Sequence, residues 1–228
     1  ALLPQRKLQC CGWEASYHYE PAGPVSGDYC DIVPTGPNRE AFLFVLGDVS
    51  GKGLAASLLV AHLHAVFHSL VSFDFPVEKL MARANRVLCE SVLSTHYATL
   101  ICGVADAKGN VRLCNAGHLP ALLLHNNQLK SLNATGMPLG LFCDGQYTVH
   151  HLKLEPGDKL LVYSDGISEA MKNGEEYGTE RVSRVASACG QLSGKELLGA
   201  CMEYLNRFMG GARKSDDLTL MAIQRMAP

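Results

Sequence analysis

The sequence predicts an α+β fold built in layers, with two mainly antiparallel β-sheets inside and helices outside. Short apolar runs are joined by hairpin signals such as Lys-Gly-Asn at residues 108–110, which favour antiparallel sheets over alternating βαβ units. Two groups of predicted helices are separated by runs of predicted strands, so each group has a sheet to cover. Apolar residues make up 47% of the 228 residues and charged residues 18%, which is ample material for a core.

The length favours one domain over two. We expect a single domain over residues 13–226, preceded by a lead or linker at residues 1–12. The chain starts at Ala1, which fits either a processed methionine or a piece of a longer protein, and the sequence does not decide between them.

The first half predicts strands, then two helices. Aspartates 28 and 31 are typical of turns when taken alone. A run of six apolar residues, 41–46, indicates a buried strand, and the longer apolar pattern at 54–71 indicates a mostly buried helix. Residues 73–76 break that helix. The expected strands are 13–19, 32–33 and 41–46, and the expected helices are 54–71 and 77–93.

The second half predicts strands in quick succession and a helical segment before the last strand. Residues 133–145 are rich in Gly, Pro and Asn and are expected to form a loop. The expected strands are 97–106, 111–115, 120–125, 129–132, 147–154, 159–163 and 218–224. The expected helices are 167–171, 179–188 and 194–209.

Composition excludes some classes of function. A net charge of −2 gives no electrostatic case for nucleic acid or an anionic membrane. Residues 54–71 come nearest to a membrane span but carry polar residues, and the N-terminus does not resemble a signal peptide. Nine cysteines without a repeated spacing indicate reduced, mostly buried thiols and a cytoplasmic protein, with zinc binding as the alternative.

Aspartates stand at the edges of four turns, each beside an apolar strand: Asp28, Asp48, Asp165 and the pair Asp216-Asp217. Carboxylates at the ends of buried strands are poorly solvated. If the strands are neighbours, these carboxylates meet at one end of a sheet, and cations are needed to offset their repulsion. The alternative is four unrelated turn aspartates.

Oxygen ligands without a supporting Cys or His favour hard ions such as Mg²⁺ or Mn²⁺. Two such ions about 3.5–4 Å apart can share a water, lower its pKa and direct it at phosphorus or a carbonyl. Glycines beside the aspartates allow backbone carbonyls and a substrate to approach closely.

Seven segments together resemble the SpoIIE/RsbU-like bacterial branch of the metal-dependent (type 2C-like, PPM) serine/threonine protein phosphatases. The resemblance covers about residues 6–225. It implies a four-layer αββα sandwich, two divalent cations (Mn²⁺ or Mg²⁺), and hydrolysis without a phosphoenzyme intermediate. The segments are GPVSGDYCD, LFVLGDVSGKGLAASLL, YATLICGVAD, NAGHLPALLL, MPLGL, LEPGDKLLVYSDGISEA and SDDLTLMAI.

The resemblance also implies roles for the aspartates. Asp48 is similar to the bridging ligand, and Asp48 and Asp165 are expected to act in catalysis through metal-bound water. Asp216 aligns best as a further ligand, although a slip of one residue would make it Asp217. Asp28 is expected on the second ion, through water. The implied ligand set is Asp28, Asp48, Val49, Asp165, Asp216 and Asp217.

The Gly51-Lys52-Gly53 turn lacks the spacing of a P-loop and is expected to shape a helix start near the substrate phosphate. Ser50 stands where eukaryotic type 2C enzymes carry a histidine proposed as general acid. Water, Ser50 or Lys52 are therefore the candidates for protonating the leaving group. The phosphate-gripping arginine near the start of those enzymes has no clear match.

Other signals favour structural roles. His64 and His68 have i, i+4 spacing without the Glu of a zinc protease motif, so helix-packing histidines are the better interpretation. His118 lies on a turn and is expected to be a satisfied structural histidine. Residues 137–140 are expected either to fold over substrate or simply to pack.

We therefore expect a cytoplasmic phosphoserine/phosphothreonine protein phosphatase in which a metal-bridging hydroxide attacks phosphorus directly. The resemblance implies a phosphorylated anti-sigma-factor antagonist as substrate, in a partner-switching stress pathway, and a homodimer formed through helices near the site. The alternatives are a catalytically weak binding module with this fold and a small-molecule phosphohydrolase.

Overall fold

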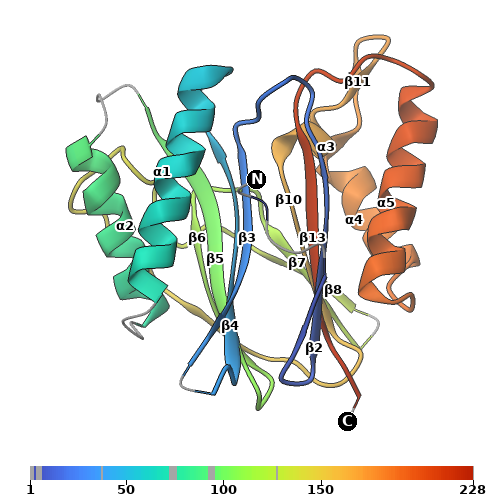
Figure 1. The fold of residues 1–228 in the computed structure, drawn as a ribbon. Helices are drawn as coiled ribbons and strands as arrows, with labels where there is room; N and C mark the ends of the chain where they lie inside the picture. Colours follow the sequence, from blue (N-terminus) through green and yellow to red (C-terminus); the bar gives the residue numbers. More distant parts are fainter. Residues whose placement is uncertain are drawn as a thin grey trace.

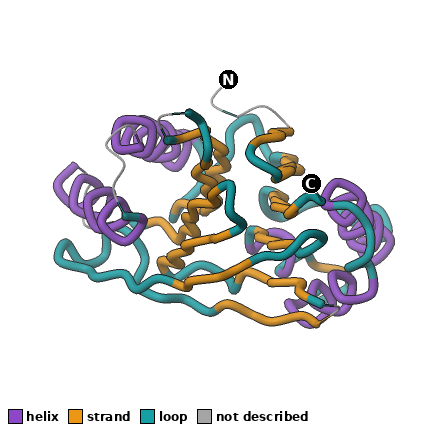
Figure 2. The backbone as a smooth tube through the Cα atoms, turned by 90° about the horizontal axis from the view of Figure 1, so that it is seen from below, coloured by secondary structure: helices purple, strands orange, loops and turns teal. Residues whose placement is uncertain are grey.

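Two β-sheets lie face to face, and helices cover the outer face of each (Figure 1). The computed structural model describes residue 3 and residues 7–36, 38–71, 76–91, 96–126 and 128–227. Viewed along the strands, the helices form the two outer layers and the strands the two inner ones (Figure 2). The predicted αββα sandwich is confirmed.

The first sheet has the strand order β1-β2-β13-β10-β7-β8. Its pairings are antiparallel throughout the described chain. The last strand, β13, lies between β2 and β10, which places the two ends of the domain side by side in one sheet. The strands are β1 (Lys7–Cys10), β2 (Trp13–Glu20), β7 (Ala121–His125), β8 (Gln128–Leu132), β10 (Lys159–Tyr163) and β13 (Leu218–Arg225).

The second sheet has the order β3-β4-β5-β6-β9, again with antiparallel pairings between its described strands. Its central strands are long and almost wholly apolar, as expected for strands covered on both faces. The strands are β3 (Asp28–Thr35), β4 (Ala41–Val49), β5 (Ala98–Asp106), β6 (Asn110–Ala116) and β9 (His150–Lys153).

Three apolar cores hold the four layers together. One lies between the second sheet and the helices α1 and α2, one between the two sheets, and one between the first sheet and α3–α5. A capping box between Ser193 and Glu196 fixes the start of α5. The helices are α1 (Leu54–Val71), α2 (Val77–Ser91), α3 (Asp165–Ser168), α4 (Gly178–Ala188) and α5 (Gly194–Met209).

Several predicted boundaries are wrong. Asp28 and Asp31 lie inside β3 rather than in a turn, because β3 pairs with β4 along its full length. The helix predicted at 167–171 is a single turn that ends at Ser168, because Met171–Lys172 (β11) pairs with Glu175–Glu176 (β12). The strand predicted at 147–154 is limited to β9.

Other differences lie at the ends of elements. In the expected lead, residues 7–10 form β1 and pair with β2. Helix α2 is described to Ser91, and the predicted helix end at 92–93 lies outside the described residues. The same holds for residues 73–75 of the predicted helix break.

Helix α1 has the length and apolar composition of a membrane span, although a core helix meets the same criterion. Here α1 buries Leu63, Phe67 and other residues in the core against the second sheet. The cysteine prediction is wrong for one pair, since Cys89 and Cys143 form a disulfide between α2 and the loop after β8. The other seven cysteines, all described, are free.

Candidate metal centre

Four strand termini meet at one edge of the sandwich. β4 ends and β3 begins there in the second sheet, and β10 ends and β13 begins in the first. The aspartates therefore come from both sheets, rather than from one sheet as the sequence predicted. A cavity of about 640 Å³ opens between them, and its lining includes Asp48, Val49, Asp165, Asp216 and Asp217.

Asp48 is the next-to-last residue of β4 and belongs to the face that lies between the sheets, as do Phe44 and Leu46. Its neighbour in register on β3 is Asp28. Gly27 packs closely at this edge, because a Cβ atom there would lie 3.2 Å from Asp48 Oδ1 and 3.3 Å from the Val49 carbonyl oxygen. The sequence pattern of buried strand followed by aspartate thus delivers a carboxylate to the cavity wall.

Asp165 reaches the cavity from the turn between β10 and α3. The Ser164 hydroxyl accepts a hydrogen bond from the Thr219 N–H at 3.1 Å and donates to the Asp217 carbonyl at 3.3 Å. Gly166 packs directly on the same carbonyl, and a Cβ atom there would lie 2.0 Å from that oxygen. The turn and the start of β13 are therefore locked together, which fixes Asp165 beside Asp216.

The carboxylates repel one another. Burial, followed by the charges of Asp165 and Asp216, raises the pKa of Asp48 from 3.8 to about 7. Burial, followed by the charge of Asp216, also raises the pKa of Asp165, against the opposing effect of the Gly166 N–H. A site with three half-buried carboxylates that repel one another suits one or two hard divalent cations, whose positive charge would offset the repulsion.

Asp216 and Asp217 have different environments, although they are adjacent. Both oxygens of buried Asp217 accept backbone hydrogen bonds, Oδ1 from the Ala22 N–H at 2.7 Å and Oδ2 from the Gly27 N–H at 3.0 Å. Asp216 is partly exposed, and its Oδ2 lies 2.7 Å from Lys52 Nζ. Asp216 is thus the better placed of the two to bind a cation, and Asp217 holds the loop between β2 and β3.

Asp28 lies deeper than the other aspartates. It is buried, it is not among the described residues that line the cavity, and its Oδ2 accepts a hydrogen bond from the Thr219 hydroxyl across the two sheets. Burial raises its pKa well above the usual range, although the hydroxyls of Thr219 and Ser164 oppose the shift. Contact between Asp28 and an ion in the cavity would therefore run through water.

The turn predicted to face the substrate does line the cavity. Gly51 and Gly53 have φ angles of 97° and 74°, which suit glycine, and both are exposed. Lys52 donates to Asp216 Oδ2 and to the Ser215 carbonyl, so its charge faces the acidic cluster. The Ser50 hydroxyl accepts a hydrogen bond from the Tyr97 N–H at 2.9 Å, which gives Ser50 a structural role in the turn.

Sequence reasoning missed one basic residue at the cavity. Arg213 is exposed and lines the cavity together with Asp48, Asp165 and Asp216. Its neighbour Lys214 also lines the cavity but is bound to Glu20. The position of Arg213 just before the Ser-Asp-Asp segment was the available signal, since a cation there faces any anion bound near Asp216.

His118 is structural, as predicted. It is buried, with Nδ1 at 2.9 Å from the Thr99 hydroxyl and Nε2 at 3.1 Å from the Tyr163 carbonyl. Burial lowers its pKa to about 4, so the ring is neutral and bridges β5 to β10 below the cavity.

Residues 137–140 pack rather than cover the acidic cavity. Leu139 is buried and pairs with Ala98, the first residue of β5, and the Asn85 side chain on α2 accepts from the Gly140 N–H at 2.8 Å. The described lining of the cavity contains no residue of this loop. The packing alternative is therefore the one the structure favours.

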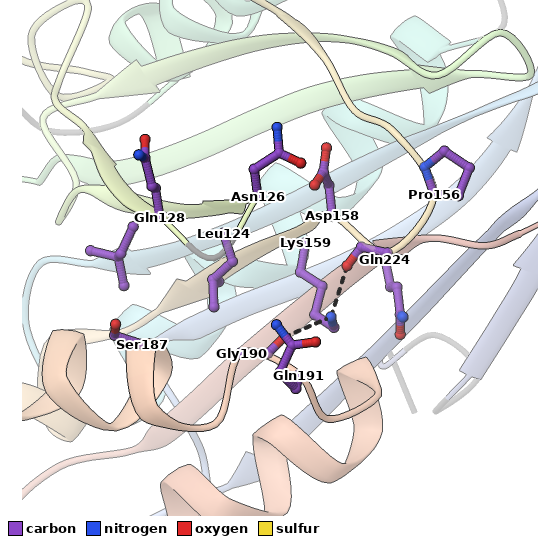
Figure 3. A pocket seen from close by; sticks show the side chains of 12 residues that line it. Leu124, Asn126, Gln128, Pro156, Asp158, Lys159, Ser187, Gly190, Gln191 and Gln224 are labelled. Carbon is purple, nitrogen blue, oxygen red and sulfur yellow. Dashed lines mark hydrogen bonds between the residues drawn. The ribbon is translucent and has the colours of Figure 1, made fainter.

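A second cavity of about 360 Å³ lies between β7, β10 and the α4–α5 connection (Figure 3). Its charged groups are already engaged. Lys159 Nζ donates to the carbonyls of Gly157 and Gly190, and Asp158 Oδ2 accepts from the Glu155 N–H and lies 2.6 Å from His125 Nδ1. This cavity offers no converging carboxylates like those at the sheet edge.

Two facing antiparallel sheets flanked by helices define the PP2C-like phosphatase fold. The solved structure of the RsbU and RsbW domains of Rv1364c from Mycobacterium tuberculosis matches it with a TM-score of 0.80 and 26% identity, over 99% of this chain and 62% of that one. The family described as Stage II sporulation protein E (SpoIIE) matches residues 38–226, and the chain belongs to this family.

Two curated relatives have sequences similar to that of this chain. Protein IcfG of Synechocystis sp. (strain PCC 6803) is 27% identical over 93% of this chain. Phosphoserine phosphatase RsbU of Bacillus subtilis is 28% identical over 65% of this chain. The chain spans 38% and 44% of the length of these two relatives, so it corresponds to one part of each.

Proposed function

We propose that the chain is a metal-dependent phosphatase that hydrolyses phosphoserine or phosphothreonine in a protein. One observation carries the proposal: Asp48, Asp165 and Asp216 come from two sheets and line one cavity that also carries basic residues. Membership of the SpoIIE family and the similarity to a phosphoserine phosphatase support the same activity.

Asp48, Asp165 and Asp216, with the Val49 carbonyl beside them, would hold two divalent cations, and Asp28 would contribute through water. Mn²⁺ or Mg²⁺, when bound, polarises the phosphoryl group and lowers the pKa of water in the site. The carboxylates are fixed before substrate arrives, by the strand ends and by the packing of Gly27 and Gly166. Such preorganisation is what electrostatic stabilisation of a transition state requires.

In the reaction, the oxygen of water bonds to phosphorus and the bond from phosphorus to the serine oxygen breaks. The serine oxygen takes up a proton, for which water and Ser50 are the candidates in this site. The Ser50 hydroxyl accepts a hydrogen bond from the Tyr97 N–H and keeps its own proton to donate, whereas Lys52 is engaged with Asp216. Arg213, at the rim, is placed to attract the dianionic phosphate.

We further propose that the substrate is a phosphorylated anti-sigma-factor antagonist in a partner-switching pathway. The relationship to RsbU and the likeness to RsbU and RsbW domains joined in one protein support this proposal. A homodimer is also proposed, because Leu54 and Leu58 at the start of α1 are large, apolar and mostly exposed, close to the cavity rim.

Two substrates test the activity: a phosphoserine-containing protein and p-nitrophenyl phosphate, each with Mn²⁺ and with chelator. We expect manganese-dependent phosphate release from the protein at a higher kcat/KM than from the small ester. Release from the small ester alone would favour a small-molecule phosphohydrolase. No release from either would favour a binding module with a phosphatase fold.

A further inference from the structure

A second group of metal-ligating side chains lies away from the acidic cavity. Asp31 on β3 and His64 and His68 on α1 have ligand atoms that all lie within 4.8 Å of one another. None of the three lines the acidic cavity. Figure 1 shows α1 lying over β3 on the outer face of the second sheet, and the two elements pack together.

The sheet itself separates this group from the acidic centre. Asp28 and Asp31 are three residues apart on β3, so their side chains point to opposite faces. Asp28 bonds to Thr219 between the sheets, whereas Asp31 bonds to His68 on the helix side. The group is therefore a separate site.

The spacing of the ligand atoms brackets that around a bound ion, since one pair is closer, as a direct hydrogen bond, and one is wider. Asp31 Oδ2 lies 2.7 Å from His68 Nε2 and 3.8 Å from His64 Nε2. The donor atoms around a tetrahedral zinc ion lie about 3.3–3.5 Å apart, given bonds of about 2.0–2.1 Å. The two imidazoles are stacked, with ring centroids 4.1 Å apart, and the Nε2 atom of each lies within 3.8 Å of the same carboxylate oxygen.

A second layer of contacts orients the carboxylate. Asp31 Oδ1 accepts from the Ile32 N–H at 2.8 Å, and Oδ2 accepts from the Tyr29 hydroxyl at 3.0 Å. Hydrogen bonds of this kind fix the ligands of metal sites. The side chain of Asp31 is 3% exposed, while those of His64 and His68 are 24% and 42% exposed, so water can complete the coordination.

A simpler role explains only part of this arrangement. The hydrogen bond to His68 satisfies the buried Asp31 carboxylate without any metal. His64 packs against Tyr29 and His68, but its Nε2 lies 3.8 Å from the same oxygen, beyond hydrogen-bonding distance, so packing alone leaves this nitrogen without a bond to the carboxylate. His64 and His68, which are spaced i, i+4 on α1, thus gain Asp31 of β3 as a third ligand.

We propose that Asp31, His64 and His68 form a binding site for a transition-metal ion, Zn²⁺, that joins α1 to β3. Two imidazoles and one carboxylate favour Zn²⁺ over the Mg²⁺ or Mn²⁺ suited to the all-oxygen centre. Because α1 starts directly after the Gly51–Gly53 turn, which lines the acidic cavity, an ion here fixes the helix that follows this turn. This site does not depend on the proposed phosphatase activity.

Cobalt titration of the full chain in excess Mg²⁺ tests the site, because Co²⁺ reports nitrogen ligation in its visible spectrum. We expect one Co²⁺ with such a spectrum, displaced by Zn²⁺, and a loss of affinity of about tenfold or more in His64→Ala and His68→Ala. His64→Ala leaves the bond between His68 and Asp31 in place, so it keeps a folded protein for the measurement.

Two controls separate the sites. His62→Ala changes a histidine two residues away on α1, which faces a different direction, and should bind Co²⁺ as the wild type does. Asp48→Asn, in the acidic centre, should also retain the spectrum. Equal binding by the wild type and His64→Ala, or no nitrogen-ligated Co²⁺ in the wild type, would overturn the proposal.

Discussion

At the scale of single residues, the acidic centre combines two kinds of aspartate. Asp48, Asp165 and Asp216 face the cavity, and Asp28 and Asp217 are buried in hydrogen bonds that hold its walls. The position of each beside a strand end predicted that all five gather if their strands are neighbours, as the family resemblance implied. The sequence could not separate the two kinds, since that depends on the loop between β2 and β3, whose N–H groups reach Asp217 from far away in sequence.

The adjacent aspartates should respond differently to substitution. Asp216→Asn should lower kcat by about a hundredfold or more while the free energy of unfolding changes little, because Asp216 is partly exposed and makes a single salt bridge, to Lys52. Asp217→Ala should lower the free energy of unfolding by about 1–3 kcal/mol, because two backbone N–H groups lose their acceptor. Kinetics and urea unfolding measure both. The reverse pattern, in which Asp216→Asn lowers mainly the free energy of unfolding and Asp217→Ala lowers mainly kcat, would assign the cation to Asp217.

The raised pKa of Asp48 predicts how stability depends on pH without metal. Between about pH 4 and pH 7 the unfolded state releases the Asp48 proton while the folded state keeps it, so stability falls as pH rises. The asparagine side chain in Asp48→Asn does not titrate in this pH range. In chelator, the free energy of unfolding of the wild type minus that of Asp48→Asn should therefore decrease from pH 4 to pH 7. A constant difference would contradict the burial of this carboxylate.

At the scale of elements, the centre depends on how the β10–α3 turn meets β13. The sequence predicted the turn at Asp165 but not the early end of α3, because the helix prediction from residue 167 did not use Asn173-Gly174. These two residues have φ angles of 51° and 83° and form the hairpin that pairs Met171–Lys172 with Glu175–Glu176. The long strands and α1, α4 and α5 were predictable, because their apolar patterns extend over many residues. The extent of β3 was not, because Asp28 and Asp31 are residues that strands disfavour.

Gly166→Ala tests this contact. The new Cβ atom would lie 2.0 Å from the Asp217 carbonyl oxygen, so the turn must move away from β13 and carry Asp165 with it. We expect a loss of about 1–3 kcal/mol in the free energy of unfolding, together with reduced activity.

Gly199→Ala is the matched control, because nothing lies within 4 Å of its added Cβ atom in α5. It should stabilise the protein by about 0.5–1 kcal/mol. Equal effects of the two changes would rule out the contact.

At the scale of the whole molecule, α1 and α2 cover one sheet and α3–α5 cover the other. The acidic centre lies at the edge where the two sheets meet. The order of elements predicted sheets inside and helices outside, and the family resemblance implied the full αββα sandwich, since patterns of single strands cannot show which strands pair across the chain. The pairing of β13 with β2 and β10, which brings Asp216 to Asp165, is the connection that local sequence signals do not contain.

The proposed homodimer can be tested at the same scale. Leu54→Glu combined with Leu58→Glu places two charges on the exposed apolar start of α1. We expect a dimer mass for the wild type and a monomer mass for the double variant by light scattering, because charges at an apolar contact lose their hydration on association. Lys79→Glu on α2 is a charge-changing control that should keep the wild-type mass. A wild-type monomer would contradict the homodimer. A dimer in both proteins would place its interface elsewhere.

The central claim is that Asp48, Asp165 and Asp216 hold divalent cations that the chain needs to hydrolyse a phosphoserine protein. The measurement is phosphate release from that protein as Mn²⁺ is titrated into metal-free wild type and metal-free Asp48→Asn, with folding of both checked by circular dichroism. We predict no release in chelator, saturable activation of the wild type by Mn²⁺, and a folded Asp48→Asn protein whose rate is lower by about a hundredfold or more. Full activity of the wild type in chelator, or wild-type rates in Asp48→Asn, would contradict the claim.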